Sequence, residues 1–123
     1  MQTETIEVDA HFGKEFAGRY VFSEINWAKR NRIIQKYTKY SKLTGQVESS
    51  DYVAIQAETI MASIKEQPES KPITLEKLLN EENGISIGLG ERFSQIVNKL
   101  NIVSIEETRF LSAPSEKTNP TPT

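Results

Sequence analysis

The spacing of hydrophobic residues predicts a chain built mainly from short helices. Beginning at Trp27, apolar residues recur at intervals of three, four and seven, which places them on one side of a helix that runs to about Leu43. Asn26 is a suitable N-cap, and Thr44-Gly45 is a typical C-terminal stop. Trp27 shares a helical face with Ile34, so we expect its side chain to be largely buried.

The same reasoning predicts three more helices. The second follows a cap at Ser49 or Ser50 and ends at Pro68. The third is short and capped by Thr74, and the fourth runs from about Ile87 to Asn101. The apolar positions expected to face the core are Val53, Ala57, Ile60, Met61 and Ile64 in the second helix, Leu75, Leu78 and Leu79 in the third, and Leu89, Phe93, Ile96, Val97 and Leu100 in the fourth.

The segment before the first helix has the alternation of an extended chain. Ile6 and Val8 alternate with acidic residues, and Tyr20 and Phe22 share one face of a period-two pattern. Two interpretations are open for residues 6–25. One is a β-hairpin with a loop somewhere in residues 11–18, and the other is irregular chain packed on the helices.

These elements together predict a mainly α fold, a small single domain of four or five short helices with an extended N-terminal segment. We expect the domain to span residues 6–111, with a frayed N-terminus over residues 1–5. A fifth element over residues 105–111 is expected as a short helix, with a strand as the alternative. Residues 112–123 hold three of the five prolines and one apolar side chain, Ala113, which is typical of a disordered tail.

Composition narrows the possible chemistry. The 123 residues include no Cys and one His, His11, so thiolate sites and multi-histidine metal sites are excluded. No P-loop or complete dinucleotide-binding motif occurs. We therefore expect no enzyme, no catalytic residues, no bound metal, no cofactor and no small-molecule substrate. No stretch is long and apolar enough to cross a membrane and no secretory signal is evident, so a cytoplasmic protein is expected.

Charge is distributed unevenly along the chain. The segment from Trp27 to Thr44 contains six basic residues and no acidic one, whereas the whole chain has a net charge of −2. A basic helix of this kind could contact phosphates or an acidic partner, or it could be a solvated face neutralised by carboxylates of neighbouring elements. The near-neutral total disfavours a dedicated nucleic-acid binder.

Several segments resemble a known family. The run YVFSEINW, ending at Trp27, and the charged helix AKRNRIIQKY that follows it resemble the tail assembly chaperones of long-tailed phages and related proviruses. The segments SSDYVAIQAETIMASI and GLGERFSQIVNKLN are similar to the later helices of that family. The resemblance covers about residues 16–111, and the matched residues are mostly core positions and helix caps.

This resemblance implies a non-catalytic function in the host cytoplasm. Chaperones of the family bind the tape-measure protein and keep it soluble until tail-tube subunits polymerise around it. The implied partner is the tape-measure protein or another tail protein, and self-association is left open. A small nucleic-acid-binding regulatory protein using the basic helix 27–44 is the alternative, and a structural tail component is another.

Two segments are candidates for the partner-binding surface. One is the basic helix, and the other is the segment Gly88–Phe93 of the last helix. An exposed groove of a small helical protein could hold a partner helix, but the sequence does not place such a groove. The candidate residues are Lys29, Arg30, Arg32, Lys36 and Tyr40 in the first segment and Leu89 and Phe93 in the second.

Overall fold

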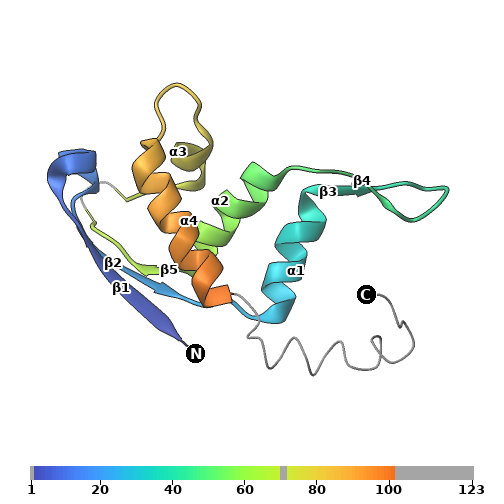
Figure 1. The fold of residues 1–123 in the computed structure, drawn as a ribbon, viewed down its shortest axis with the longest axis horizontal. Coiled ribbons are helices and arrows are strands. Elements are labelled where there is room, and N and C mark those ends of the chain that lie inside the picture. Colours follow the sequence, from blue (N-terminus) through green and yellow to red (C-terminus); the bar gives the residue numbers. More distant parts are fainter. Residues whose placement is uncertain (1, 70–71, 102–123) are drawn as a thin grey trace, which may run out of the picture.

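The computed structural model describes residues 2–69 and 72–101. Within these ranges the chain forms four α-helices and two small sheets (Figure 1). Two single 3₁₀ turns, Ala10–Phe12 and Lys14–Phe16, connect the first two strands. In chain order the other elements are β1 (Thr3–Val8), β2 (Gly18–Ser23), α1 (Trp27–Lys36), β3 (Thr38–Tyr40), β4 (Val47–Ser50), α2 (Tyr52–Ser63), β5 (Ile64–Glu66), α3 (Leu75–Leu79) and α4 (Ile87–Asn101).

The expectation of a mainly α fold is therefore wrong, because the described residues form a small mixed α/β domain. The N-terminal segment is a β-hairpin: β1 and β2 pair antiparallel from Thr3 opposite Ser23 to Val8 opposite Gly18. Strand β1 begins inside the segment that was expected to fray. Three residues directly after α2 form β5, which adds to the other edge of β2 and gives the strand order β1-β2-β5.

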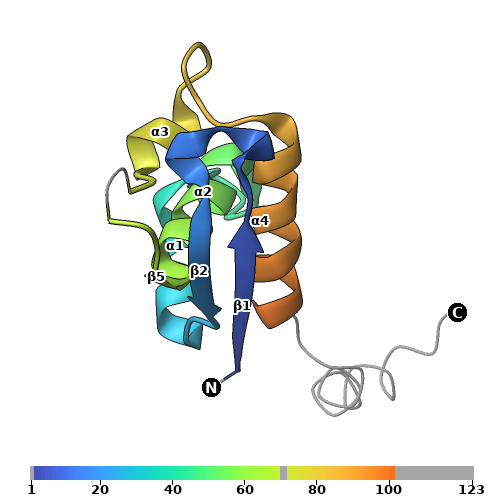
Figure 2. The same cartoon turned by 90° about the vertical axis from the view of Figure 1, so that its left-hand side faces the viewer.

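The core lies between this sheet and α4. Figure 2 shows the sheet in front of the helices, with α4 running beside β1. The inward side chains of β2, Tyr20 and Phe22, pack against Phe93 of α4, with ring centroids 5.2 and 5.4 Å from that of Phe93. Tyr20 keeps its hydroxyl satisfied by donating to the Phe16 carbonyl at 2.9 Å, and burial raises the pKa of this hydroxyl.

Local capping predictions are confirmed at two of the helices. The Asn26 side chain accepts a hydrogen bond from the Lys29 backbone N–H at 2.9 Å, and Thr74 accepts one from Lys77 at 3.1 Å. Helix α4 has the predicted bounds, and its five predicted core residues are buried. The cap of α2 is Asp51, one residue beyond the predicted serines, and it accepts from Ala54.

The largest local correction concerns residues 37–50. The helix expected to reach Leu43 ends at Lys36, and the following residues form an antiparallel hairpin of β3 and β4, which we call the arm. The hydroxyls of Thr38 and Ser50 are hydrogen-bonded across its base at 2.8 Å. Gly45 has a φ of 75° in the turn, a conformation that favours glycine. The helical spacing of Tyr37 and Tyr40 was misleading, since Tyr40 lies in β3 and its side chain is about half exposed.

A second correction concerns Trp27, whose side chain is 79% exposed rather than buried. Helix α1 lies at the periphery and packs on α2, and Ile33 is its one fully buried residue. Ile34 and Tyr37 are half-buried, so the contact is made by the second half of the helix. Trp27 stands at the opposite end, in the first turn. The fifth element predicted at residues 105–111 and the tail predicted at residues 112–123 lie outside the described residues.

The exposure of Trp27 and the burial of Phe93 make a direct test of the fold. Phe93 is 0% exposed, so Phe93→Ala should lower the free energy of unfolding by about 3–5 kcal/mol. Trp27→Ala removes an aromatic ring at an exposed position and should change it by about 0.5 kcal/mol or less. Urea denaturation followed by far-UV circular dichroism measures both. A larger effect for Trp27→Ala than for Phe93→Ala would contradict this placement of the core.

Candidate functional site

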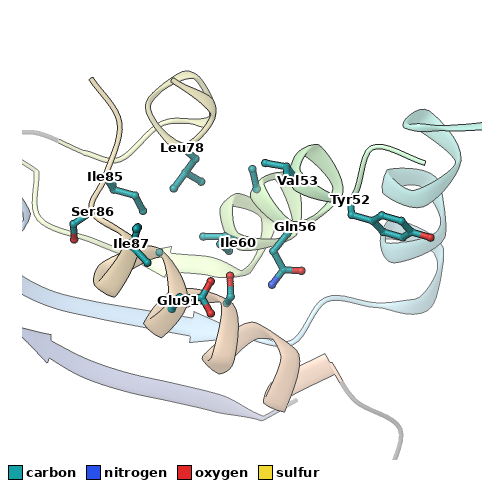
Figure 3. A pocket seen from close by; sticks show the side chains of 12 residues that line it. Tyr52, Val53, Gln56, Ile60, Leu78, Ile85, Ser86, Ile87 and Glu91 are labelled. Atoms are coloured by element: carbon teal, nitrogen blue, oxygen red, sulfur yellow. The ribbon is translucent and has the colours of Figure 1, made fainter. Parts of the chain in front are cut away.

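A groove lined largely by apolar residues lies between α2, α3 and the start of α4. It has a volume of about 400 Å³. Figure 3 shows Leu78, Ile85 and Ile87 on one side of it and Val53 and Ile60 of α2 on the other. These residues come from two parts of the sequence, namely α2 and the segment that contains α3, the loop after it and the start of α4.

The walls of the groove are apolar and accessible. Ile87 is 86% exposed and Val53 is 68% exposed, although both lie on helices of the folded body. Leu78 and Ile85 are half-buried and pack on the edge of the core, so they support the groove floor together with buried Ile60. Apolar side chains that are exposed together around a hollow are typical of a protein-binding surface.

Helix α2 explains why one wall exists. Its sequence, YVAIQAETIMAS, is apolar on nearly every side, and a helix of this kind needs cover on more than one face. Ala54, Ala57 and Ile60 are buried within the molecule. Val53 faces the groove, and Tyr52 extends beyond its end toward α1 (Figure 3). The fold therefore leaves part of the apolar surface of α2 open.

Two of the polar side chains that line the groove are hydrogen-bonded within the protein. The Gln56 amide donates to the Asn98 side chain at 3.2 Å, and the Ser86 hydroxyl accepts from the Leu89 backbone at 3.3 Å. Glu91 is the one residue in the lining that carries a charge at neutral pH. An apolar hollow with one carboxylate is suited to holding an apolar side-chain stripe, and it offers no pair of groups for acid–base catalysis.

The structure separates the predicted site residues. Leu89 and Phe93 are fully buried, since they form the core-facing side of α4. Their side chains are covered by the protein's own sheet, so they are not available to contact a partner and belong to the core. The exposed apolar residue of that segment is instead Ile87.

The six basic residues also do not share one helix. Lys39 and Lys42 lie on the arm, as does the half-exposed Tyr40. On α1, Lys29, Arg30 and Arg32 are exposed, and no carboxylate of the described residues lies within 4 Å of them. Arg30 borders a second, polar cleft between α1, α2 and α4. Only Lys36 fits the interpretation of a neutralised face, through its ion pair with Glu58.

The groove residues Val53, Leu78, Ile85 and Ile87 were not identified as a site from the sequence. One signal was present, because the all-round apolar character of α2 indicates an uncovered face. Ile87 gave no such signal: it is a single apolar residue before Gly88, and its exposure depends on how the α3–α4 loop enters the helix.

Other candidate chemistry finds little support in the described part of the chain. No group of three or more His, Asp or Glu side chains there could hold a metal ion. His11 is exposed in the first 3₁₀ turn, where its ring meets Phe12 edge-on. None of the helices in those residues is long and apolar enough to cross a membrane.

Comparisons with known proteins identify no relative: no family model matches the chain, and neither a curated protein nor a solved structure is detectably similar to it.

One cluster of charged groups fixes the base of the arm to α2. Glu58 of α2 accepts hydrogen bonds from the Lys36 ammonium and the Tyr37 hydroxyl, both at 2.6 Å. The bond from Lys36, followed by that from Tyr37, lowers the pKa of the Glu58 carboxyl. The same contact raises the pKa of Lys36. The hydrogen bond that the Tyr37 hydroxyl donates to Glu58 raises the pKa of Tyr37.

These shifts predict a specific loss of stability in acid. Because the pKa of Glu58 is lowered in the folded state, its contribution is complete above the ordinary value of 4.5 and disappears as the pH falls through the lowered pKa. Melting temperatures measured between pH 7 and acid should fall less steeply for Glu58→Gln than for the wild type. Parallel curves would show that the Lys36–Glu58 contact does not contribute to stability in solution.

Proposed function

We propose that this protein is a non-catalytic chaperone of viral tail assembly that binds an apolar helical segment of the tape-measure protein. The observation that supports the proposal most is the open groove between α2, α3 and α4, with Val53 and Ile87 exposed at its two walls. The resemblance of residues 16–111 to tail assembly chaperones supplies the identity of the partner.

The groove suits a helical client for a physical reason. An amphipathic helix presents apolar side chains at intervals of three and four, and an apolar hollow between helices accepts such a stripe. The tape-measure protein of the family is long and helical, so its apolar stripes need cover before assembly. A wide, open groove with few polar contacts also permits release, because no buried hydrogen bond or ion pair has to break.

Binding of nucleic acid through α1 is the second candidate. The exposed cations Lys29, Arg30 and Arg32 favour it, because none of them forms an ion pair within 4 Å with a carboxylate of the described residues. The two candidates differ in their dependence on salt. Phosphate contacts weaken steeply as salt rises, whereas an apolar groove keeps its occupant.

Co-expression with the tape-measure protein tests the proposal. The wild type should raise the soluble yield of the client and co-purify with it, and the complex should survive a wash at about 0.3 M salt. Ile87→Asp and Val53→Asp place a charge in the groove and should each abolish co-purification. Trp27→Asp is the matched control, because it adds the same charge at an exposed aromatic on α1, outside the groove lining.

Two results would contradict the chaperone. One is equal recovery of the client with Ile87→Asp and with the wild type. The other is recovery of nucleic acid alone, lost at high salt and abolished by Arg30→Ala together with Arg32→Ala, which would support the alternative.

A further inference from the structure

The arm is the second place where apolar side chains are exposed together. Leu43 at its tip is 96% exposed, and Val47 and Tyr40 are 59% and 49% exposed. Tyr40 and Val47 are opposite one another in the β3–β4 register, so their side chains share one face of the hairpin. The arm therefore presents one apolar face and an apolar tip to solvent.

The tip is ordered rather than loose. The Ser41 backbone N–H donates to the Gln46 carbonyl at 2.8 Å, and the Gly45 N–H donates back to the Ser41 carbonyl at 2.8 Å. The Ser41 hydroxyl also accepts from the N–H groups of Leu43 and Thr44. This network holds Leu43 outward in one conformation, which reduces the entropy lost when the tip binds.

The arm makes few contacts with the rest of the molecule. A two-stranded hairpin is marginally stable by itself in water, and the main contacts of this one with the body are near its base, with α1 and through the hydrogen bond from Tyr37 to Glu58. A surface that covered Leu43 and Val47 would stabilise the arm and remove apolar area from water at the same time.

The protein's own groove cannot be that surface within one molecule. Figure 1 shows the arm extending beyond α1, away from α3 and the start of α4. The groove of a second molecule is free of this restriction, and it offers exposed apolar walls at Val53 and Ile87.

Charge favours the same pairing. Residues 27–50, which form α1 and the arm, contain six basic residues and one acidic residue, Glu48. Residues 73–91, which form α3, the loop after it and the start of α4, contain four acidic residues and one basic residue, Lys77. The acidic residues are Glu76, Glu81, Glu82 and Glu91, and all four are exposed. Opposite charges at two distant ends attract copies of the chain in a head-to-tail orientation.

We propose that the arm of one molecule docks in the α2–α3–α4 groove of a second molecule, so that copies associate head to tail. Leu43 and Val47 enter the apolar hollow, and Lys39 and Lys42 face the acidic rim that contains Glu91. This inference does not depend on the tape-measure protein, because an arm can fill the groove whatever the natural client is. A client helix would compete with it for the same walls.

Such a contact joins two different surfaces, and therefore it produces open chains or closed rings, the smallest ring being a reciprocal dimer in which each arm fills the groove of the other molecule. The tip of a hairpin is small compared with a standard interface of about 1,600 Å². The association should accordingly be weak, concentration-dependent and weakened further by salt.

Two variants separate the halves of the contact. Leu43→Asp replaces the apolar side chain at the tip of the arm by a charged one and leaves the groove unchanged. Ile87→Asp does the same to one wall of the groove and leaves the arm unchanged. Each should be monomeric by sedimentation equilibrium at concentrations up to about 1 mM, the range of weak association constants, whereas the wild type and the control Trp27→Asp should increase in mass with concentration. Mixed in equal amounts, the two variants should form a dimer of twice 13.9 kDa that grows no further, since only one arm and one groove remain.

Every other outcome overturns the proposal. A wild type that stays monomeric shows that the arm has no such partner, and a mixture that stays monomeric shows that arm and groove do not meet. Dimers of Ile87→Asp alone indicate arm–arm pairing, and dimers of Leu43→Asp alone indicate groove–groove pairing. Leu43 and Ile87 are both exposed, so both variants should fold like the wild type, and circular dichroism tests this. Leu43→Ser is a second variant of the tip that introduces no charge. Leu43→Asp should still bind the client, which separates this test from that of the chaperone.

Discussion

Tyr20 and Phe22 of β2 lie against Phe93 of α4, and the positions of the other elements depend on this contact. The three rings lie within 5.2–6.5 Å of one another, in tilted or stacked arrangements that add to the gain from burial. Since β2 is the central strand, holding it against α4 also positions β1 and β5. Helix α2 runs directly into β5 and is placed by it, and α1 then packs on the outer side of α2.

This order of packing explains where apolar surface is left over. The sheet and α4 cover one another, whereas α2 is covered on the inside and only partly by α1 and the short α3. The uncovered portion becomes the groove, and the hairpin between α1 and α2 has no layer to pack on. Both proposals therefore have one origin, a small core that buries its aromatic centre and leaves outlying elements with apolar faces open to other chains.

The sequence predicted features that depend on neighbouring residues. Helix α4 was identified with its bounds because it is long and strongly amphipathic, and Asn26 was identified as a cap because capping needs only a side chain and the next turn. The arm and the exposure of Trp27 were missed, since Tyr40 fits a helical and a strand pattern equally well and the burial of Trp27 depends on how far α2 extends along α1. The groove joins α2 to the later segment of α3 and α4, and no local pattern describes that pairing.

The long sequence separation between the N-terminal strands and α4 has a consequence for synthesis. Asn101 accepts a hydrogen bond from the Ile25 backbone 76 positions earlier, and Lys99 pairs with Glu4 across 95 positions. The aromatic residues of β2 cannot be covered until α4 has emerged from the ribosome, so the first half of the chain has no core of its own while it is being translated. Folding should then occur as one late, cooperative step, with closure of the long loop between β2 and α4 as its main entropic barrier.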